Sequence, residues 1–565
     1  MPIKRTILLG ESLIQKGLIS RKDLDAGLKE HKKTGQFLGT TLLKLGFIKE
    51  EALYSVLSEQ LKIPYVKIKE LTITPGVLEK VPVKFACHYK LIPIKFEKDI
   101  LSVAVADPLD IRALDDLRLL LGCDVNGVLA SEPDINDAIR KYYGIGAETI
   151  EEIMDTSEKI EDISLPSSKT EDLEELVEDA SIIKFVNQIL VQAVKDRATD
   201  IHIEPYEDEL KVRYRIDGVL HDIPVPSNIK YFQAAIASRI KIMANLDIAE
   251  RRLPQDGRIK IQVAGEGLDL RVSTLPTQFG ESVDLRVLAG AMLYSLENLG
   301  FFPSDLKILE DLIKKPHGII FVTGPTGSGK TTTLYACLLQ INSKDRKIIT
   351  IEDPIEYQIK GITQVQVRPR IGLSFATGLR SLLRHDPDIM MVGEVRDFET
   401  SEITIRVALT GHLVFSTLHT NDAAGGVARL IDMGVEPYLV ASSVECFIAQ
   451  RLVRLICPEC KVEKKPDREV LKEFGVKDDI SKVSVYEGKG CESCKFTGFK
   501  GRTGIYEFLL VNEEIRELIL QRASSDNIKK KALKLGMHTL RMDGWEKIKK
   551  GLTTINEVMR VTEED

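Results

Sequence analysis

The chain has 565 residues, of which 43% are hydrophobic and 29% charged, with a formal net charge of −7 and a pI near 5.9. This composition is typical of a globular protein of about three or four domains, and its acidic balance argues against a nucleic-acid machine. The sequence contains no apolar run of about 18 residues, and polar side chains interrupt the N-terminus, so we expect neither a membrane span nor a signal peptide. These features predict a cytoplasmic protein whose eight cysteines stay reduced.

Residues 5–62 contain an internal repeat. Its first copy comprises Leu9, Gly10, Leu13, Gly17, Ile19, Leu24 and Leu28, and its second, 29 positions later, Leu38, Gly39, Leu42, Gly46, Ile48, Leu53 and Leu57. This spacing predicts two short helix–loop–helix units that pack pseudo-symmetrically. On spacing alone the module is either a docking unit whose repeated residues are only core, or a ligand-binding one.

A compact α/β unit is expected over residues 80–143, because 91–94 and 101–105 resemble strands and 111–121 a helix. Together with the repeat it forms an N-terminal docking or regulatory region, residues 1–145. From 141 to 179 the composition shifts to thirteen acidic and three basic residues, so we assign 146–179 as an acidic linker.

Residues 180–290 show strand-like alternation. In 210–217, 269–273 and 284–287 apolar residues alternate with polar ones, several of them arginines. The pattern predicts a half-buried α/β sheet domain with arginines, including Arg271 and Arg286, on its open face. Such arginines either solubilise the face or bind phosphate groups, since a guanidinium matches phosphate oxygens.

A phosphate-binding loop follows the apolar segment 318–323. It comprises Gly324, Pro325, Thr326, Gly327, Ser328, Gly329, Lys330 and Thr331, and continues into an expected helix from Thr331 and Thr332 onward. Its glycines let backbone N–H groups close on nucleotide phosphates, Lys330 reaches the β- and γ-phosphates, and the Thr331 hydroxyl binds Mg²⁺. The sequence therefore predicts a nucleotide site.

Residues 295–450 alternate strands with helices, which predicts a doubly wound α/β nucleotide domain. Three expected strands, 347–351, 389–392 and 412–418, are followed by Glu352 and Glu356, by Glu394, and by His419. Because active groups gather at the carboxyl ends of parallel strands, these side chains are expected at one site.

The expected roles follow from phosphoryl-transfer chemistry. Glu394 would hold Mg²⁺, Glu352 and Glu356 are candidates to orient or deprotonate the attacking water, and His412 and His419 could sense the γ-phosphate. Arg380 and Arg384 lie four residues apart, which on a helix places both cations on one face.

Cys457, Cys460, Cys491 and Cys494 form two CxxC pairs within the C-terminal region 451–565, which is otherwise expected to be largely helical. Four thiolates make a closed tetrahedral Zn²⁺ site, so we predict structural zinc in preference to a redox function.

Together these segments resemble the secretion ATPases that drive type II secretion and type IV pilus assembly. The matching segments are Gly324–Thr331, Ile349–Tyr357, Leu379–Asp397, Thr410–Thr420, Arg251–Arg258, Arg271–Glu281 and Gly536–Thr562. The resemblance implies a multidomain α/β protein with a RecA-like P-loop ATPase domain, behind an α/β sheet domain and an N-terminal helical-repeat and α+β region.

The resemblance also implies residue roles and partners. Glu356 would be the catalytic base, Glu394 the Walker-B acid, and His412 and His419 the histidine pair. Arg271 and Arg286 would be brought to the phosphates, with Arg380 and Arg384 in support. The implied protein is a homo-hexamer that binds ATP and Mg²⁺, with no stable nucleic acid. It would act peripherally at the inner membrane through a platform protein and membrane-anchored assembly proteins.

The N-terminal repeat resembles a module that binds cyclic di-GMP in some family members. There the first repeat usually begins Arg-Leu-Gly, whereas this chain has Leu8-Leu9-Gly10. The missing guanidinium could have stacked on guanine and paired with phosphate, so the departure argues against cyclic di-GMP binding. Alternatives to assembly are a pilus retraction motor, a motor for nucleic-acid uptake or conjugation, and a scaffold that senses ATP without hydrolysing it.

Overall fold

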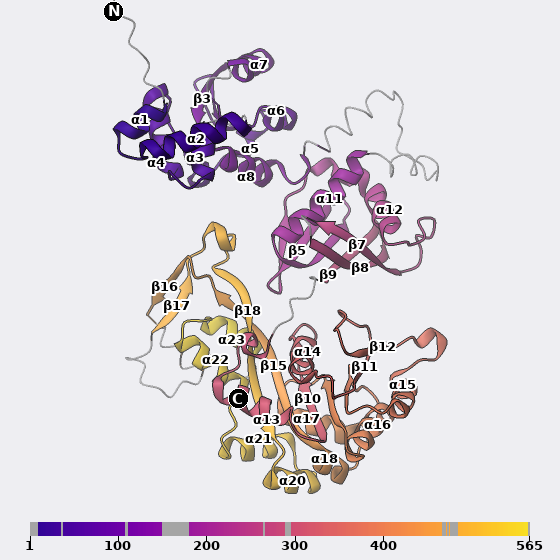
Figure 1. The fold of residues 1–565 in the computed structure, drawn as a ribbon. Helices are drawn as coiled ribbons and strands as arrows, with labels where there is room; N and C mark the ends of the chain where they lie inside the picture. The colour runs from indigo at the N-terminus through magenta and orange to yellow at the C-terminus, as the bar shows by residue number, and fades with distance from the viewer. Residues whose placement is uncertain are drawn as a thin grey trace, which may run out of the picture. The chain divides into compact units, whose positions relative to one another are not determined.

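The computed structural model describes residues 9–34, 38–107, 111–147, 149, 180–263, 266–288, 295–465, 471, 474 and 484–562, and divides the chain into two units, Met1–Val287 and Leu288–Asp565 (Figure 1). The acidic linker lies almost entirely outside the described residues. Among the described residues, no helix combines the length and apolar character that a bilayer crossing requires.

The repeat forms two matching helical hairpins, as its spacing predicts. Their helices are α1 (Leu9–Gln15), α2 (Arg21–Thr34), α3 (Leu38–Lys44) and α4 (Glu50–Leu61). Gly17 and Gly46 occupy equivalent turns with φ of 69° and 72°, where glycine is favoured because it lacks a Cβ. Leu13 and Leu42 are fully buried at equivalent core positions. The repeated residues therefore build a shared core.

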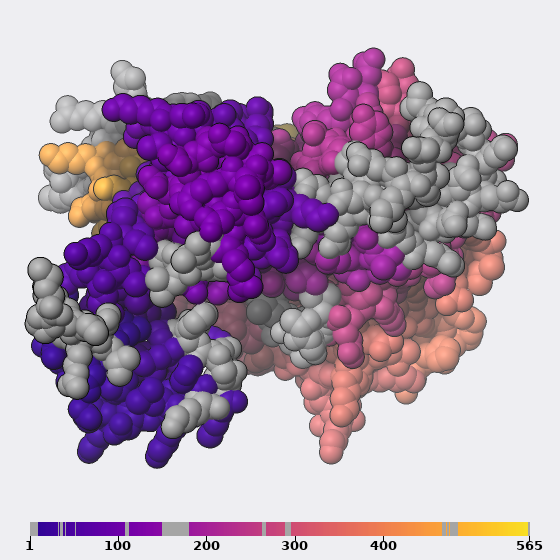
Figure 2. Space-filling view, turned by 90° about the horizontal axis from the view of Figure 1, so that it is seen from above, coloured from indigo at the N-terminus to yellow at the C-terminus, as the bar shows by residue number. Residues whose placement is uncertain are grey.

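A second lobe follows the repeat. Strands β1 (Leu91–Glu97), β2 (Ile100–Val105) and β3 (Asp124–Leu129) form a sheet in that order, with helices α5 (Pro75–Leu78), α6 (Val83–His88), α7 (Ile111–Leu121) and α8 (Glu132–Tyr143) packed around it. In the space-filling view the repeat and this α/β lobe are the indigo and violet surfaces (Figure 2). The expected strands and helix of this unit are confirmed.

The next part of the first unit is a six-stranded sheet in the order β6-β5-β4-β9-β8-β7. Its strands are β4 (Ala198–Pro205), β5 (Leu210–Ile216), β6 (Val219–Ile223), β7 (Gln255–Val263), β8 (Glu266–Thr277) and β9 (Gly280–Leu288). The apolar face packs on helices α11 (Ala180–Lys195) and α12 (Gln233–Met243). Alternation leaves the polar positions on the opposite face, as predicted.

The second unit is built on a seven-stranded sheet in the order β12-β11-β13-β14-β10-β15-β18. Six strands are parallel: β10 (Gly318–Thr323), β11 (Ile348–Glu352), β12 (Thr363–Gln366), β13 (Ile389–Val392), β14 (Leu413–Leu418) and β15 (Val444–Ile456). Strand β18 (Phe499–Leu510) pairs with β15 antiparallel. The CxxC segment, with strands β16 (Lys461–Lys464) and β17 (Val485–Gly488), is thus an insertion between two neighbouring strands of this sheet.

Helices cover both faces of this sheet. One face packs on α13 (Pro303–Leu312) and α14 (Lys330–Ile341). The other packs on α15 (Phe375–Leu382), α16 (Phe398–Leu409), α17 (Ala423–Asp432), α18 (Pro437–Ser443), α20 (Glu513–Leu520), α21 (Ser525–Lys534), α22 (Leu540–Lys549) and α23 (Ile555–Val561). Strand β15 runs across residue 450, so the sheet continues beyond the expected end of the nucleotide domain. The C-terminal helices therefore complete the core of that domain.

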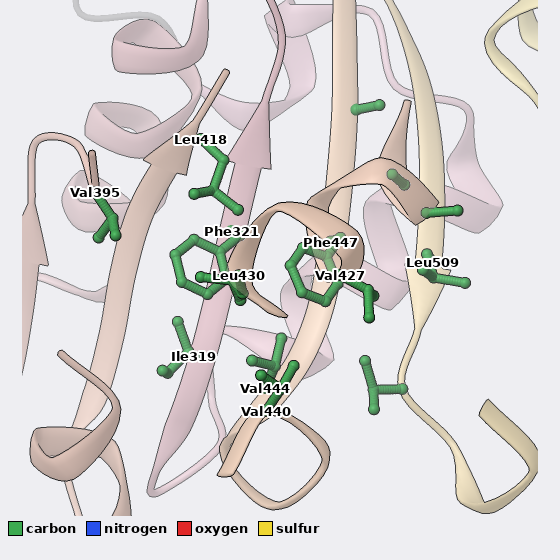
Figure 3. Close-up of a cluster of buried hydrophobic side chains, with 14 of the residues drawn as sticks. Ile319, Phe321, Val395, Leu418, Val427, Leu430, Val440, Val444, Phe447 and Leu509 are labelled. Atoms are coloured by element: carbon green, nitrogen blue, oxygen red, sulfur yellow. The ribbon is translucent and has the colours of Figure 1, made fainter. Parts of the chain in front are cut away.

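Close packing of α17 on the sheet depends on Gly426. The rings of Phe321 and Phe447 stack at 5.5 Å between their centroids, and Val427 and Leu430 of α17 lie over them (Figure 3). A Cβ on Gly426 would lie 2.6 Å from the Phe447 ring. The absence of a side chain at this position lets the helix approach the rings.

We predict that Gly426→Ala lowers the free energy of unfolding by about 1–3 kcal/mol through overpacking, although alanine is the better helix former. Urea unfolding measures the change. In a Phe447→Leu background the cost should be clearly smaller, and an equal cost in both backgrounds would contradict this contact as its cause.

Candidate active site

The phosphate-binding loop lies between buried β10 and helix α14. Gly327 and Gly329 have φ of 80° and 87°, and a Cβ on Gly329 would lie 2.8 Å from Gln450 Nε2. The Ser328 hydroxyl is buried and has no hydrogen-bond partner among the described residues. Lys330 Nζ donates to the carbonyls of Gly324 at 2.7 Å and Pro325 at 3.0 Å. The unsatisfied hydroxyl and the lysine within the loop fit a bound phosphate group.

The ammonium group of Lys330 lies in a partly desolvated setting. Burial lowers its pKa to about 8, the carboxylate of Glu394 opposes this shift, and the guanidinium of Arg451 adds to it. An anionic ligand would stabilise the charged form of such a lysine, because the negative charge offsets the cost of desolvation. Thr331 and Thr332 follow it, half-buried, in the first turn of α14.

Glu394 and His419 meet at the carboxyl edge of the sheet. Nε2 of His419, just after β14, lies 3.3 Å from Glu394 Oε2, just after β13. Arg396 pairs with the other carboxylate oxygen at 2.5 Å. The Thr417 hydroxyl donates to the carbonyl of Gly393 at 2.7 Å, which ties the peptide before Glu394 to β14. The structure thus brings Glu394, His419 and Lys330 together.

Glu352 has a different environment from the one its predicted role requires. Its carboxyl is 2% exposed and accepts hydrogen bonds from the hydroxyls of Tyr335 and Thr350 and from Gln364 Nε2 at 3.2 Å. Burial raises its pKa. These donors and the surrounding core enclose the carboxyl, and the role of Glu352 in orienting or deprotonating the attacking water stays a prediction.

Glu356 lies half-buried in the loop after β11. Its backbone N–H donates to the Tyr335 hydroxyl at 3.4 Å, and Gln364 Nε2 donates to the carbonyl of Tyr357 at 3.1 Å. The network around Glu352 therefore also anchors the loop that carries Glu356. Tyr335 belongs to α14, so the same network joins this loop to the helix that begins at Lys330.

His412 lies at the opposite end of β14 from His419, away from the carboxyl edge of the sheet. It precedes β14, and its carbonyl accepts from Gly318 N, at the start of β10. A strand rises about 3.3 Å per residue, so the length of β14 separates His412 from His419. His412 Nδ1 instead contacts the carbonyl of Val407 at 2.9 Å, at the end of α16. The role of His412 at the γ-phosphate stays a prediction.

Arg380 and Arg384 are not joined to the phosphate-binding loop by any hydrogen bond among the described residues. Helix α15 ends at Leu382, and Arg384 lies in the following 3₁₀ turn, where it donates to the carbonyl of Arg380 at 3.1 Å. Arg380 pairs with Glu399 of α16 at 2.6 Å. These contacts stabilise the outer helices.

Arg271 and Arg286 belong to a row of charged residues across the sheet of the first unit. Strands β8 and β9 are neighbours joined by a two-residue turn, and the two arginines lie at matching distances from it. Arg258 pairs with Arg271 across β7 and β8, and Asp200 pairs with Arg286 and with Arg215. Paired residues share a face, so four arginines and one aspartate line up. Asp200 Oδ1 accepts from Arg286 Nε at 2.8 Å.

The four cysteines of the CxxC pairs converge. Their Sγ atoms all lie within 4.8 Å of one another. Burial would raise the pKa of the Cys494 thiol, but the backbone N–H groups of Cys491 and Gly498 outweigh it, and the pKa falls to about 6. Four converging thiols with donors that favour a thiolate fit a structural Zn²⁺ site.

The sequence reasoning missed several residues that support the site. Tyr335 and Gln364 hold the Glu356 loop, Gln450 accepts from the Thr333 hydroxyl of α14 at 2.8 Å, and Arg258 extends the arginine row. One signal was available for Tyr335: it lies in the helix that begins at Lys330, on the face that packs toward β11. The pairings of Gln364 and Gln450 depend on strand register, which is not visible in the sequence.

Fold and site together define a P-loop ATPase. The model of the family described as "Type II/IV secretion system protein" matches residues 175–560, and that of the MshEN domain matches 61–149, largely beyond the helical repeat. The chain belongs to the type II/IV secretion system protein family.

Relatives match over nearly the whole chain. The type IV pilus assembly ATPase PilB of Myxococcus xanthus is 45% identical over 564 residues, covering 99% of both chains. The type II secretion system protein E of Xanthomonas campestris is 43% identical over 564 residues, covering 98% of both. The structure of the ATPase DotB from Legionella pneumophila, 21% identical, matches with a TM-score of 0.50 over 67% of this chain and 95% of that chain, which shows a shared fold.

We predict about one zinc ion per purified chain, measured by elemental analysis. Cys460→Ser and Cys494→Ser should lose it, because a closed site needs all four thiolates. Cys123→Ser, at a lone half-buried cysteine, serves as the control and should keep it. Equal zinc content in all variants would contradict the assignment.

Proposed function

We propose that this protein is a hexameric, Mg²⁺-dependent ATP hydrolase that powers assembly of a type IV pilus or a type II secretion pseudopilus. It would act on the cytoplasmic side, through an inner-membrane platform protein and membrane-anchored assembly proteins. The observation that carries the proposal is the meeting of Lys330, Glu394 and His419 at the edge of one parallel sheet. The two full-length relatives, named for pilus assembly and type II secretion, support the biological role.

The proposed roles rest on the chemistry of each side chain and on the resemblance to the family. Backbone N–H groups of Gly324–Thr331 and the Ser328 hydroxyl hold the phosphates, and Lys330 places its charge on them. A bound Mg²⁺ would neutralise developing charge, and Thr331 and Glu394 are the residues placed to hold it. Glu356 accepts the proton of the attacking water, and His419, through Glu394, senses the terminal phosphate. Arg271 and Arg286 supply further positive charge to the phosphates.

The competing motors are less well supported. Both full-length relatives are named for assembly or secretion, which favours extension over retraction. The net charge of −7 argues against a nucleic-acid motor. Cyclic di-GMP is left out of the proposal because Leu8 replaces the expected arginine.

We predict that Glu356→Gln lowers kcat for ATP hydrolysis at least about 100-fold, because the base is lost while its shape is kept. Glu394→Gln should lower it comparably through loss of the metal-binding carboxylate. Steady-state phosphate release measures both. Lys330→Ala is the positive control for loss of the nucleotide site. If it abolishes turnover while neither glutamine variant lowers it, the roles assigned to the two carboxylates are wrong.

We also predict that nucleotide binding takes up a proton at Lys330. At pH 8.5 most of this lysine is neutral in the free protein, since its pKa is about 8, and phosphates restore the charged form. Calorimetric titration with Mg-ADP in two buffers of different ionisation enthalpy should show uptake of about 0.5–1 proton at pH 8.5 and much less at pH 7. Affinity should fall as the pH rises above 8. Equal proton uptake at both pH values would contradict this origin.

A further inference from the structure

A second pocket opens beside the phosphate-binding loop, on the side of the C-terminal helices. Its volume is about 400 Å³, and Pro325 forms part of its wall. The remaining wall comes from β15, β18, the start of α17, and helices α21, α22 and α23. Pro325 is the only residue of the phosphate-binding loop in its lining, and Lys330 does not line it.

The pocket carries more positive than negative side chains. Its cations are Arg451, Lys529, Arg541 and Arg560, of which Arg560 is paired with Glu557 at 3.0 Å, and its acids are Asp422 and Glu507. Both acids are already engaged by backbone donors. Asp422 Oδ1 accepts from Gly425 N at 2.8 Å as the cap of α17, and Glu507 Oε1 accepts from Ala423 N at 2.9 Å.

The charge of Glu507 is also reduced. Burial raises its pKa to about 7, so a large part of this carboxyl is neutral near neutral pH. The acids of the pocket therefore compensate its cations only in part.

Arg541 shows the imbalance most directly. Its side chain lines the pocket in a residue only 9% exposed, and its Nε has no hydrogen-bond partner among the described residues. Arg541 forms no ion pair with any described residue, and its guanidinium lies 5.0 Å from the centroid of the Phe474 ring. Lys547, a buried cation of the same helix, is paired with Asp543 at 2.7 Å. A buried guanidinium without a counter-charge is unfavourable unless a ligand supplies one.

We propose that this pocket is a second anion site that binds an oxyanion of the phosphate class, with Arg541 as its central ligand and Arg451, Lys529 and Arg560 around it. Guanidinium groups match the oxygens of such anions. Pro325 of the phosphate-binding loop lines the pocket, which places the site beside that loop. The identification of the ligand as inorganic phosphate released by hydrolysis rests on the proposed function, whereas anion binding does not.

The test is the thermal unfolding midpoint of the full chain in sodium phosphate and in sodium chloride of equal ionic strength. Phosphate at about ten times its dissociation constant should raise the midpoint of the wild type by about 3 °C. The Lys330→Ala variant should keep a shift of this size, because the pocket does not use Lys330. Saturating Mg-ADP should leave the shift in place if the ligand is free phosphate, and abolish it if the phosphates of a nucleotide occupy the pocket.

Two variants examine the pocket itself. Arg541→Gln should lose the phosphate shift and should unfold in chloride at a temperature no lower than the wild type, because an uncompensated buried charge is removed. Should that variant not fold, Lys529→Gln tests the same site and should reduce the shift. Its neighbour Lys530, exposed on the same helix, gives the control Lys530→Gln, which should match the wild type.

Three results would overturn the proposal. One is a phosphate shift that persists in Arg541→Gln and disappears in Lys330→Ala, since phosphate would then bind only at the phosphate-binding loop. Another is the absence of any shift in the wild type and in Lys330→Ala. The third is a shift seen only when Glu563, Glu564 and Asp565 are changed to their amides, which would mean that the chain's own carboxylates fill the pocket. Loss of ATP hydrolysis alone would overturn the proposed function and leave this site intact.

Discussion

Parallel pairing in one register is the constraint on which the candidate active site depends. Strands β10 and β14 pair from Gly318 with Leu413 to Thr323 with Leu418, and β13 pairs with β14 and β11 in step with them. Because parallel strands end at the same edge, the loop after β10, Glu394 after β13 and His419 after β14 converge there. A shift of one residue in any of these pairings would move each side chain to the opposite face of the sheet, against the wrong helices, and would displace the functional groups.

Buried hydrogen bonds then hold the aligned loops in place. Glu352 is held by Tyr335, Thr350 and Gln364, and the same tyrosine and glutamine hold the loop that carries Glu356. A satisfied network of this kind in a low-dielectric setting fixes geometry, because each broken bond leaves a buried polar group unpaired. The helix that begins at Lys330 and the Glu356 loop are therefore joined by the same buried hydrogen bonds.

In the C-terminal region, buried charged side chains are likewise held by partners within the fold. Arg454 pairs with Glu557 at 2.6 Å, and Lys547 pairs with Asp543, so most buried charges of this region have partners within the fold. The pairing of β15 with β18 brackets the CxxC insertion, whose four thiols fit a Zn²⁺ site that would cross-link it. Arg541 differs from these residues because it forms no ion pair among the described residues.

The sequence by itself determined the local elements and the chemistry of each motif. The glycine spacing of Gly324–Thr331, the acids after two of the apolar strands, the CxxC pairs and the N-terminal repeat all depend on neighbouring residues, so they are visible along the chain. Only the tertiary structure decided which of these groups meet. It separated His412 from His419 by the length of a strand, enclosed Glu352, and carried the sheet past residue 450. Those outcomes depend on strand register and helix packing between residues far apart in the chain, which local patterns do not encode.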